Sequence, residues 1–524
     1  MRTVLFLLCL LALQSIAFSD NVVEPMNRGD KIIVPQQCRN IQRAIKSASN
    51  GDTIIVSPGT YRENIDFLGK SITLKSEQGP AVTIIDGGQN GSVVEFTKGE
   101  DSHAVLNGFT VTNGYGMVWT KSAGDGGGIY CDNASPTIIN NVITGNFASS
   151  GYGGGIFIKS NSAPIVAYNT ITDNSSIQCG SGIYCRSSTP YILYNTISKN
   201  RSMLGFGGAI TCSLGSKAYI VSNTMLGNWA KAGGGGICVY QSSPVITGNI
   251  LAGNTTLAAG GGILVFWSSA PEITNNTISR NEAEDGGGIA CKNHASATVS
   301  NTIIWNNDAQ VGREIYLGKS NSPATLDIAH SNVDMTLGSI FSDTNCFINT
   351  GPGIISSDPY FVDPSNDDFH LTIYSPCINV GDNTVDTLPS TDFEHNPRIA
   401  PVQSGTTDIG ADEFYHHLYT KGTAEAGGEI ELVVIGYPNV PATLYIRPIV
   451  ADPPSQGGSG IFNLYAFWDE WKLGPIPLSG VLRQNVAVPP SAAPGDRFRL
   501  FVTEGYFFNG GPLVRTNEME LTIE

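Results

Sequence analysis

Two columns of side chains recur in this sequence at intervals of 27 residues. The first column is aromatic, and the second, two residues further along the chain, is charged: Tyr130, Phe157 and Tyr184, then Asp132, Lys159 and Arg186. Aromatic rings can stack on the apolar faces of sugars, and a guanidinium pairs with a carboxylate through two parallel hydrogen bonds. Together these residue types predict contact with a chain of uronic acids.

The charged column also carries the groups that a polysaccharide lyase needs. Lys159 could remove the proton beside the sugar carboxylate, while Arg186, or a cation held partly by Asp132, would stabilise the resulting anion. An aspartate, a lysine and an arginine on adjacent strands also form an ordinary cross-strand charge ladder. The sequence leaves both interpretations open.

A glycoside hydrolase would need a different arrangement, with two carboxylates roughly 5 to 9.5 Å apart across the bond that it cleaves. Asp125 with Asp132, or Glu284 with Asp285, could supply them. Neither pair recurs or lies beside a clear aromatic platform. If the protein is an enzyme, a lyase is therefore favoured over a hydrolase.

Both columns belong to a repeat that runs through the middle of the chain. A glycine-rich step leads seven times into an isoleucine, 26 or 27 residues apart: Ile129, Ile156, Ile183, Ile210, Ile237, Ile263 and Ile289. Each unit holds three short runs of Ile, Val, Thr and Tyr bounded by Gly, Asn, Ser and Pro, without helical periodicity. The pattern predicts an all-β fold, a parallel β-helix with three strands per coil.

Alternation along a strand decides which side chains face outward. Each repeat isoleucine and the residue two positions later should face the interior, which makes small core residues of Cys131, Cys185, Cys212 and Cys291. None of these cysteines has the spacing of a zinc site, so we assign them no metal. The two functional columns then lie on the outer face, about 7 Å apart along the strand and about 4.8 Å between coils.

An asparagine precedes and follows the third strand of each coil. The pairs are Asn141/Asn146, Asn169/Asn174, Asn195/Asn200, Asn223/Asn228, Asn249/Asn254, Asn276/Asn281 and Asn301/Asn306. Stacked at the strand spacing, these side chains are expected to form amide ladders. They follow the coil rather than one locus, so we interpret them as scaffold.

The amino-terminal region reads as an export signal followed by a cap. Residues 1–19 combine an arginine, an apolar run and small residues, as is typical of a secretory signal peptide. Within residues 20–51, Ile41, Ala44, Ile45 and Ala48 lie at helical spacing and predict an amphipathic helix that caps the β-helix of residues 52–323. No later run of about 18 apolar residues appears, so no membrane insertion is expected.

Two further regions are expected beyond the repeats. Residues 324–417 hold irregular coils and an acidic closing segment, whose carboxylates could bind Ca²⁺. Residues 418–524 alternate as strands do and predict a β-sandwich that acts as a binding module or a spacer. Its aromatic residues either fill the core or offer a binding surface: Tyr465, Phe467, Trp468 and Trp471. Cys346 and Cys377 could form a disulfide.

The run GDTIIVSPGTY at residues 51–61 and the Gly-Gly-Gly-Ile repeats also carry a family resemblance. Over roughly residues 35–415 the chain is similar to secreted right-handed parallel β-helix proteins of the pectin-lyase-like superfamily. The resemblance implies right-handed coiling and a role on extracellular carbohydrate. The sequence lacks the paired aspartates and Gly-His-Gly step of polygalacturonases, and the Asp-His and arginine motifs of pectate lyases. Fold alone does not specify a reaction.

Composition narrows the range of partners. The net charge of −16 over 524 residues opposes unaided binding to nucleic acid or to anionic membranes. Our leading hypothesis is a monomeric protein, secreted or at the cell surface, that binds a polysaccharide or cell-surface glycan; whether it also cleaves that chain, as a lyase, is left open by the sequence. The competing hypothesis is a non-catalytic surface or matrix protein, in which the β-helix is a rigid spacer or adhesin and the carboxy-terminal domain makes the contacts.

Overall fold

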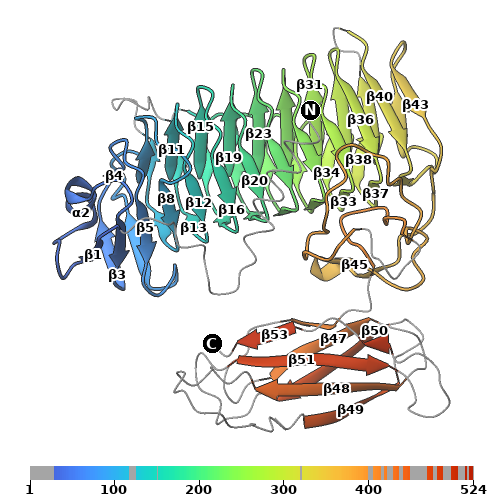
Figure 1. Ribbon diagram of the computed structural model, residues 1–524. Coiled ribbons are helices and arrows are strands. Elements are labelled where there is room, and N and C mark those ends of the chain that lie inside the picture. Colours follow the sequence, from blue (N-terminus) through green and yellow to red (C-terminus); the bar gives the residue numbers. More distant parts are fainter. Residues whose placement is uncertain are drawn as a thin grey trace. The chain divides into compact units, whose positions relative to one another are not determined.

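The computed structural model describes residues 29–116, 125–149, 151–318, 322–398 and 405–414, and beyond these only strands between residues 418 and 522. The expected signal peptide lies outside the described residues, as do Tyr465, Phe467 and Trp468. The chain divides into two units: residues 1–358 with 379–412, and residues 359–378 with 413–524. The first unit is a stack of parallel coils that runs from the blue strands beside α2 to the yellow strand β43 (Figure 1).

Three main sheets run the length of the first unit, which confirms the predicted parallel β-helix. Sheet A contains the second strand of each regular coil: β1 (Lys31–Val34), β2 (Thr53–Val56), β5 (Thr73–Ser76), β8 (Val105–Asn107), β12 (Thr137–Ile139), β16 (Ile165–Ala167), β20 (Tyr191–Leu193), β24 (Tyr219–Val221), β28 (Val245–Thr247), β32 (Glu272–Thr274), β36 (Ser296–Ser300), β40 (Thr325–Ala329) and β43 (Phe347–Thr350).

Sheet B contains the third strand of each coil: β3 (Gly59–Arg62), β6 (Thr83–Asp86), β9 (Thr110–Thr112), β13 (Val142–Thr144), β17 (Thr170–Thr172), β21 (Thr196–Ser198), β25 (Thr224–Leu226), β29 (Ile250–Ala252), β33 (Thr277–Ser279), β37 (Ile303–Trp305) and β41 (Asn332–Val333). Sheet C begins each coil at the repeat isoleucine and carries the predicted functional columns: β4 (Ile65–Asp66), β7 (Val94–Phe96), β11 (Ile129–Asp132), β15 (Ile156–Lys159), β19 (Ile183–Arg186), β23 (Ile210–Ser213), β27 (Ile237–Tyr240), β31 (Ile263–Phe266), β35 (Ile289–Lys292), β39 (Ile315–Gly318) and β42 (Ile340–Ser342).

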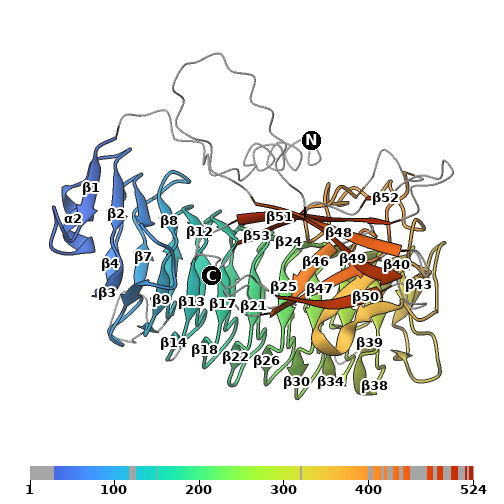
Figure 2. The ribbon, with the colours of Figure 1, turned by 90° about the horizontal axis from the view of Figure 1, so that it is seen from below.

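A fourth sheet of short strands, sheet D, was not expected from the sequence. It connects sheet B back to sheet C and follows one edge of the stack in Figure 2: β10 (Tyr115–Gly116), β14 (Phe147–Ala148), β18 (Ser175–Ser176), β22 (Arg201–Ser202), β26 (Trp229–Ala230), β30 (Thr255–Thr256), β34 (Glu282–Asp285) and β38 (Asp308–Val311). Most of these strands hold two residues, too few for a sequence pattern to reveal.

The interior of the coils is the apolar column that the repeat predicts. All seven repeat isoleucines are fully buried, and so are the four cysteines two residues later. All nine described cysteines are free thiols, including Cys346 and Cys377, so the suggested disulfide is not formed. Burial raises the pKa of the Cys131, Cys185 and Cys291 thiols, to about 12 at Cys291. These cysteines are therefore inert core residues, as expected.

The predicted cap is the helix α2 (Ile41–Ser47), and the first coils satisfy both of its ends. The Glu63 carboxylate accepts the backbone N–H groups of Ile41 and Gln42, each at 2.9 Å. At the other end, the Lys70 ammonium donates to three carbonyls, those of Ile45, Lys46 and Ala48. A carboxylate at the amino end and a cation at the carboxyl end both complement the helix dipole. In the described part of the chain, no helix is long and apolar enough to cross a membrane.

The asparagines form two buried ladders, one at each end of sheet B. Each Asn Oδ1 accepts both the backbone N–H and the side-chain Nδ2–H of the asparagine one coil earlier, as Asn174 does from Asn146 at 3.1 and 3.0 Å. The predicted pairs are confirmed up to Asn276/Asn281. The last pair was predicted one residue too early, because the ladders continue through Thr302 and Asn307. The register is unchanged there, because the step from Asn276 to Thr302 is 26 residues, as in earlier coils. The ladder position holds a threonine, and the prediction chose the neighbouring Asn301 instead.

Glycines at the start of sheet C fall into two kinds. The glycine three positions before the repeat isoleucine has positive φ, as at Gly126 (62°) and Gly153 (71°). Gly128 and Gly155 do not have positive φ, and they lie against the next coil. A Cβ atom at either position would lie 2.6 Å from a carbonyl oxygen of that coil.

Gly155→Val should therefore destabilise the β-helix through close contact rather than through backbone angles. We expect a loss of roughly 1–3 kcal/mol in the free energy of unfolding, the usual effect of overpacking. Urea denaturation followed by circular dichroism measures it, with Thr170→Val, at an exposed site of the same coil, as the matched control. Equal midpoints for the two variants would contradict the close-contact explanation.

Residues 379–398 and 405–412 pack along the side of the coils rather than across one end. The Asp382 carbonyl accepts from Asn301, the Thr387 carbonyl from Thr247 and the Asp408 carbonyl from Asn275. Each partner lies in or beside the turn between sheets A and B, so this segment, which we call the strap, links successive coils. Figure 1 shows it as an orange trace beside β33 and β37.

The second unit is built from antiparallel strands, as expected for a β-sandwich. Its described strands form a hairpin, β44 (Phe361–Asp363) and β45 (Asp368–Leu371), which flank the short helix η1 (Pro364–Asn366). A three-stranded and a five-stranded sheet follow: β46 (Leu418–Lys421), β47 (Glu429–Ile435) and β50 (Val481–Ala487); then β48 (Pro441–Pro448), β49 (Asp469–Pro475), β51 (Arg497–Glu504), β52 (Val514–Arg515) and β53 (Met519–Thr522).

Candidate ligand-binding site

The six predicted site residues come together on sheet C in the predicted register. Tyr130 pairs with Phe157, which pairs with Tyr184, across β11, β15 and β19. In the same strands Asp132 pairs with Lys159, which in turn pairs with Arg186. Parallel in-register pairing places the same position of every coil in one column, so the repeat period was sufficient to predict this arrangement.

The aromatic column does not form the open platform that we expected. Tyr130, Phe157 and Tyr184 are only 3%, 0% and 6% exposed. Tyr152, from the loop before β15, stacks on Tyr184 with ring centroids 4.6 Å apart, and a sugar cannot reach faces that other rings already cover. The rings of the column also pack on one another at 5.2 and 5.7 Å. Stacking on a sugar would therefore require other rings, which lie nearer the surface.

The charged column contains an ion pair between two adjacent strands and, on the third strand, an exposed arginine. The Lys159 ammonium lies 3.3 Å from the Asp132 carboxylate and 5.1 Å from the centroid of the Tyr130 ring. Arg186 is exposed. Asp125 accepts the Tyr152 backbone N–H, and burial raises the pKa of Asp125 while Lys159 and Arg186 oppose that rise. Arg186 is thus the residue of this column best placed to meet an anionic ligand.

A groove of about 350 Å³ begins beside this column and crosses the next three coils. Its lining residues are aromatic, small or hydroxylated: Tyr152, Cys179, Tyr184, Phe206, Thr211, Ser213, Cys238, Tyr240, Phe266 and Trp267. Phe266 packs between Phe206 and Tyr240, with ring centroids 5.1 Å from each. Trp267 is 43% exposed. The groove shares Tyr184 with the predicted aromatic column, so the two sites are continuous.

The polar groups of the groove are hydroxyls. Ser213 donates to the Tyr184 hydroxyl at 2.9 Å, and Thr211 donates to the Phe206 carbonyl at 3.1 Å. None of the lining residues is charged. An aromatic groove with a few fixed hydroxyls suits a ligand with apolar faces and hydroxyl edges.

The sequence analysis did not predict this groove because it followed the aromatic column, which continues after Tyr184 as Thr211, Cys238 and Leu264. In these later coils the aromatic residues lie instead in the column that is charged in the first coils, at Tyr240 and Phe266. A comparison of both columns over all coils could have found that shift. Phe206 also follows the repeat, because it lies two coils after Tyr152 at the position before the positive-φ glycine, and it forms a bridge with Gly233 of the next coil.

Residues 73–246 and 228–351 match the family described as the right handed beta helix region. The matched span, residues 73–351, covers 279 of 524 residues, more than half of the chain. The chain belongs to this family. Membership confirms the right-handed coiling and the predicted resemblance to the pectin-lyase-like superfamily. No curated protein matches the sequence.

One solved structure similar to this right-handed β-helix protein is the enzymatically active domain of tailspike protein 2 from bacteriophage CBA120. The two chains are 12% identical, and the comparison covers 95% of this chain and 76% of the tailspike chain. With a TM-score of 0.17, the likeness carries no argument about function.

The acidic residues of the strap in this β-helix protein hold its turns. Asp408 accepts the Asn379 backbone N–H at 2.6 Å, and Asp392 accepts those of Glu394 and Asn396 at 2.8 Å. The fully buried Arg398 donates to the carbonyls of residues 411 and 412. These contacts explain the Asn-Pro-Arg and Asp-Ile-Gly-Ala-Asp motifs as structural. Binding of Ca²⁺ by the segment stays a prediction.

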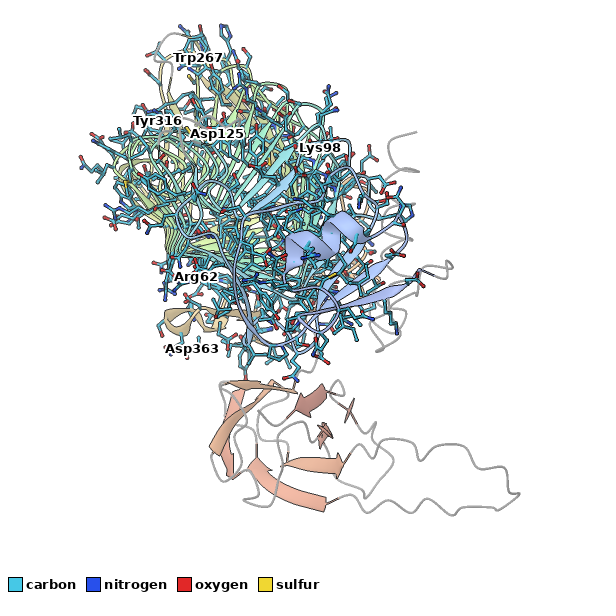
Figure 3. The ribbon with its side chains drawn as sticks, turned by 90° about the vertical axis from the view of Figure 1, so that its left-hand side faces the viewer. Arg62, Lys98, Asp125, Trp267, Tyr316 and Asp363 are labelled. Carbon is cyan, nitrogen blue, oxygen red and sulfur yellow. The ribbon has the colours of Figure 1, made fainter. Side chains whose placement is uncertain are left out.

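Three of the four carboxylates considered for a hydrolase are also engaged, and Glu284 is exposed. Asp285 pairs with Lys292 at 3.0 Å, and Asp132 pairs with Lys159. Asp125 contacts the loop that carries Tyr152. Seen along the coils, Asp125, Trp267 and Tyr316 lie on the same side of the first unit (Figure 3). The side that sheet C forms therefore gathers the candidate functional residues of this β-helix protein.

Proposed function

We propose that this β-helix protein binds polysaccharide outside the cell, through the aromatic groove of sheet C. The observation that carries the proposal is the groove itself, an uncharged aromatic channel with fixed hydroxyls and Arg186 beside its entrance. Burial of a sugar face against Tyr240, Phe266 and Trp267 would supply the affinity. The signal-like residues 1–19 support export.

Cleavage of the bound chain by β-elimination is the enzymatic form of this proposal. Lys159 would remove the C5 proton of an acidic sugar while Arg186 pairs with its carboxylate; the C4–O bond then breaks as the C4–C5 double bond forms, and water protonates the leaving oxygen. The Lys159 ammonium now pairs with Asp132, so it must leave that carboxylate and lose its proton before the amine can act as a base. If no cleavage occurs, the same residues still serve as an anion-binding edge of the groove.

The proposal predicts that Phe266→Ala with Trp267→Ala weakens binding at least about tenfold, or about 1.4 kcal/mol. Affinity electrophoresis of the full chain through gels that contain polygalacturonate, alginate or a neutral glucan measures this loss. Phe347→Ala is the matched control, because Phe347 is 58% exposed but lies on sheet A. Equal retardation of both variants would exclude the groove as the binding site.

The lyase form is tested in the same samples by the ultraviolet absorbance of unsaturated products. A rise with the wild type that Lys159→Ala with Arg186→Ala abolishes would establish elimination and its site. Binding without any rise would leave a binding protein. If the wild type binds no polysaccharide, the alternative is favoured, in which the β-helix is a spacer and the second unit makes the contacts.

A further inference from the structure

We propose a second carbohydrate platform on sheet C, formed by Tyr316 and Phe341 with the Lys292–Asp285 ion pair. It would extend the groove into a track for an acidic glycan that lies parallel to the axis of the coils. This inference rests on the proposed function and specifies its ligand, a long chain whose acidic sugars are separated by neutral ones.

The rings of this platform are open where those of the first coils are buried. Tyr316 and Phe341 are register partners on β39 and β42, and their rings stack with centroids 5.3 Å apart and an angle of 10° between planes. Phe341 is 40% exposed, whereas Phe157 in the same column is fully buried. The last coils therefore provide the stacked aromatic surface that the sequence had predicted for the first coils.

The platform is continuous with the groove. Tyr316 packs on an apolar cluster that Phe206 and Phe266, two lining residues of the groove, also contact; its buried members are Cys238, Ala259, Leu264 and Ala290. From Tyr184 to Phe341 the column crosses six strand steps. At about 4.8 Å per step, the track extends over about 29 Å. A surface of this length suits a chain rather than a single sugar.

Charge appears at two places in the charged column of the track, at Arg186 beside its start and at Lys292 two strand steps before Phe341. The Lys292 ammonium lies 3.0 Å from the Asp285 carboxylate and 4.9 Å from the centroid of the Tyr316 ring. This repeats the arrangement of Lys159 with its own aspartate and tyrosine. Arg186 and Lys292 occupy the same column four strand steps apart, about 19 Å.

This spacing identifies the ligand chemistry. A chain with net charge −16 repels polyanions overall, so an acidic glycan needs local cations, and those of the track are separated by uncharged aromatic coils. Acidic sugars would lie at Arg186 and Lys292, with neutral sugars stacked on the rings between them. The carboxylate of Asp285 can accept from sugar hydroxyls.

The ring of Tyr316 packs against Gly318. Gly318 pairs with Lys292 and is the next residue of the charged column. A Cβ atom at Gly318 would lie 2.5 Å from Cε1 of Tyr316, so the ring lies over a position without a side chain. Gly318→Ala should therefore displace the ring without removing it.

Titration calorimetry tests the track with a size series of oligosaccharides in which uronic acids are separated by neutral sugars, such as those of hyaluronate, beside oligogalacturonates of equal length, in which every sugar is acidic. The wild type should bind long oligomers at least tenfold more tightly than oligomers that fill the groove alone. Phe341→Ala should abolish this gain while leaving the affinity for short oligomers unchanged, and Lys292→Gln should lower the salt dependence of binding to the long ones. Phe347→Ala is again the matched control.

The outcomes separate this inference from the proposed function. If short oligomers bind and Phe266→Ala with Trp267→Ala weakens them, but Phe341→Ala leaves the affinity for long oligomers unchanged, the groove stands and the track is wrong. If Phe341→Ala changes only the sedimentation coefficient, the platform joins copies of the chain and the inference also fails. If no oligomer binds, both proposals are wrong.

Discussion

Asn228→Ala is expected to lower the free energy of unfolding by roughly 3–5 kcal/mol, although the residue touches no proposed ligand. Asn228 is fully buried in the middle of a ladder. Its Oδ1 accepts the N–H and the Nδ2–H of Asn200 at 3.1 and 3.0 Å, and its own Nδ2 donates to the Ile197 carbonyl and to Asn254. Alanine removes these partners at once and leaves a small cavity.

Urea denaturation and the melting temperature measure this loss. Asn349→Ala is the control, because the amide of Asn349 is exposed on β43 and donates to Asp327. We expect the control to change stability by less than about 0.5 kcal/mol. If the two variants unfold at the same urea concentration, the ladders do not stabilise the coils through buried hydrogen bonds.

Glu314→Gln is expected to make the protein more resistant to alkaline conditions. Glu314 is 1% exposed and ends the second ladder, where its carboxylate accepts from the N–H and the Nδ2–H of Asn307 at 3.1 and 2.6 Å. Burial raises the pKa of Glu314 from 4.5 to about 7, against the opposing effect of these hydrogen bonds.

The sign of the pH dependence follows from that rise. Because the folded state binds the proton more tightly than the unfolded state, the stabilisation is fully present below about pH 4.5 and is lost as the pH rises through about 7. The shift corresponds to roughly 3 kcal/mol. Glutamine stays neutral at every pH, and its amide oxygen can accept as the asparagine oxygens do elsewhere in the ladder.

Chemical denaturation at a series of pH values provides the measurement. Relative to the wild type, Glu314→Gln should gain roughly 3 kcal/mol between acid and alkaline pH. Glu272→Gln, at an exposed site of β32, should show no such gain. Parallel stability curves for wild type and Glu314→Gln would mean that Glu314 titrates as it does in the unfolded chain.

The ends of the asparagine ladders show which contacts of this fold the sequence could predict and which it could not. The recurrence of asparagine every 26 to 28 residues predicted every asparagine partner in the regular coils, since each coil repeats the one before it. The prediction failed by one residue at Asn301, because the ladder position in that coil holds Thr302. The asparagine repeat also did not predict that Glu314 ends the second ladder, because a carboxylate in that place breaks the repeat instead of following it.

One part of the candidate site was likewise predictable from the sequence, and another part was not. The register of Asp132, Lys159 and Arg186 was predictable, because in-register parallel pairing depends only on the repeat. Which rings are open was not predictable, because exposure depends on how side chains of different strands and coils pack on one another. Tyr152 covers the ring of Tyr184, whereas Phe206, at the equivalent position two coils later, lines the groove.

By itself, the sequence determined the all-β solenoid, its capping helix, the inward column of isoleucines and cysteines, and the outward columns of sheet C. These features follow from alternation along strands and from identical spacing between coils, which are local properties. Only the tertiary structure decided which outward rings are buried, where the groove lies and how the strap follows the coils. Those features depend on contacts between residues far apart in the chain, such as Thr247 with Thr387, and no local pattern encodes such pairings.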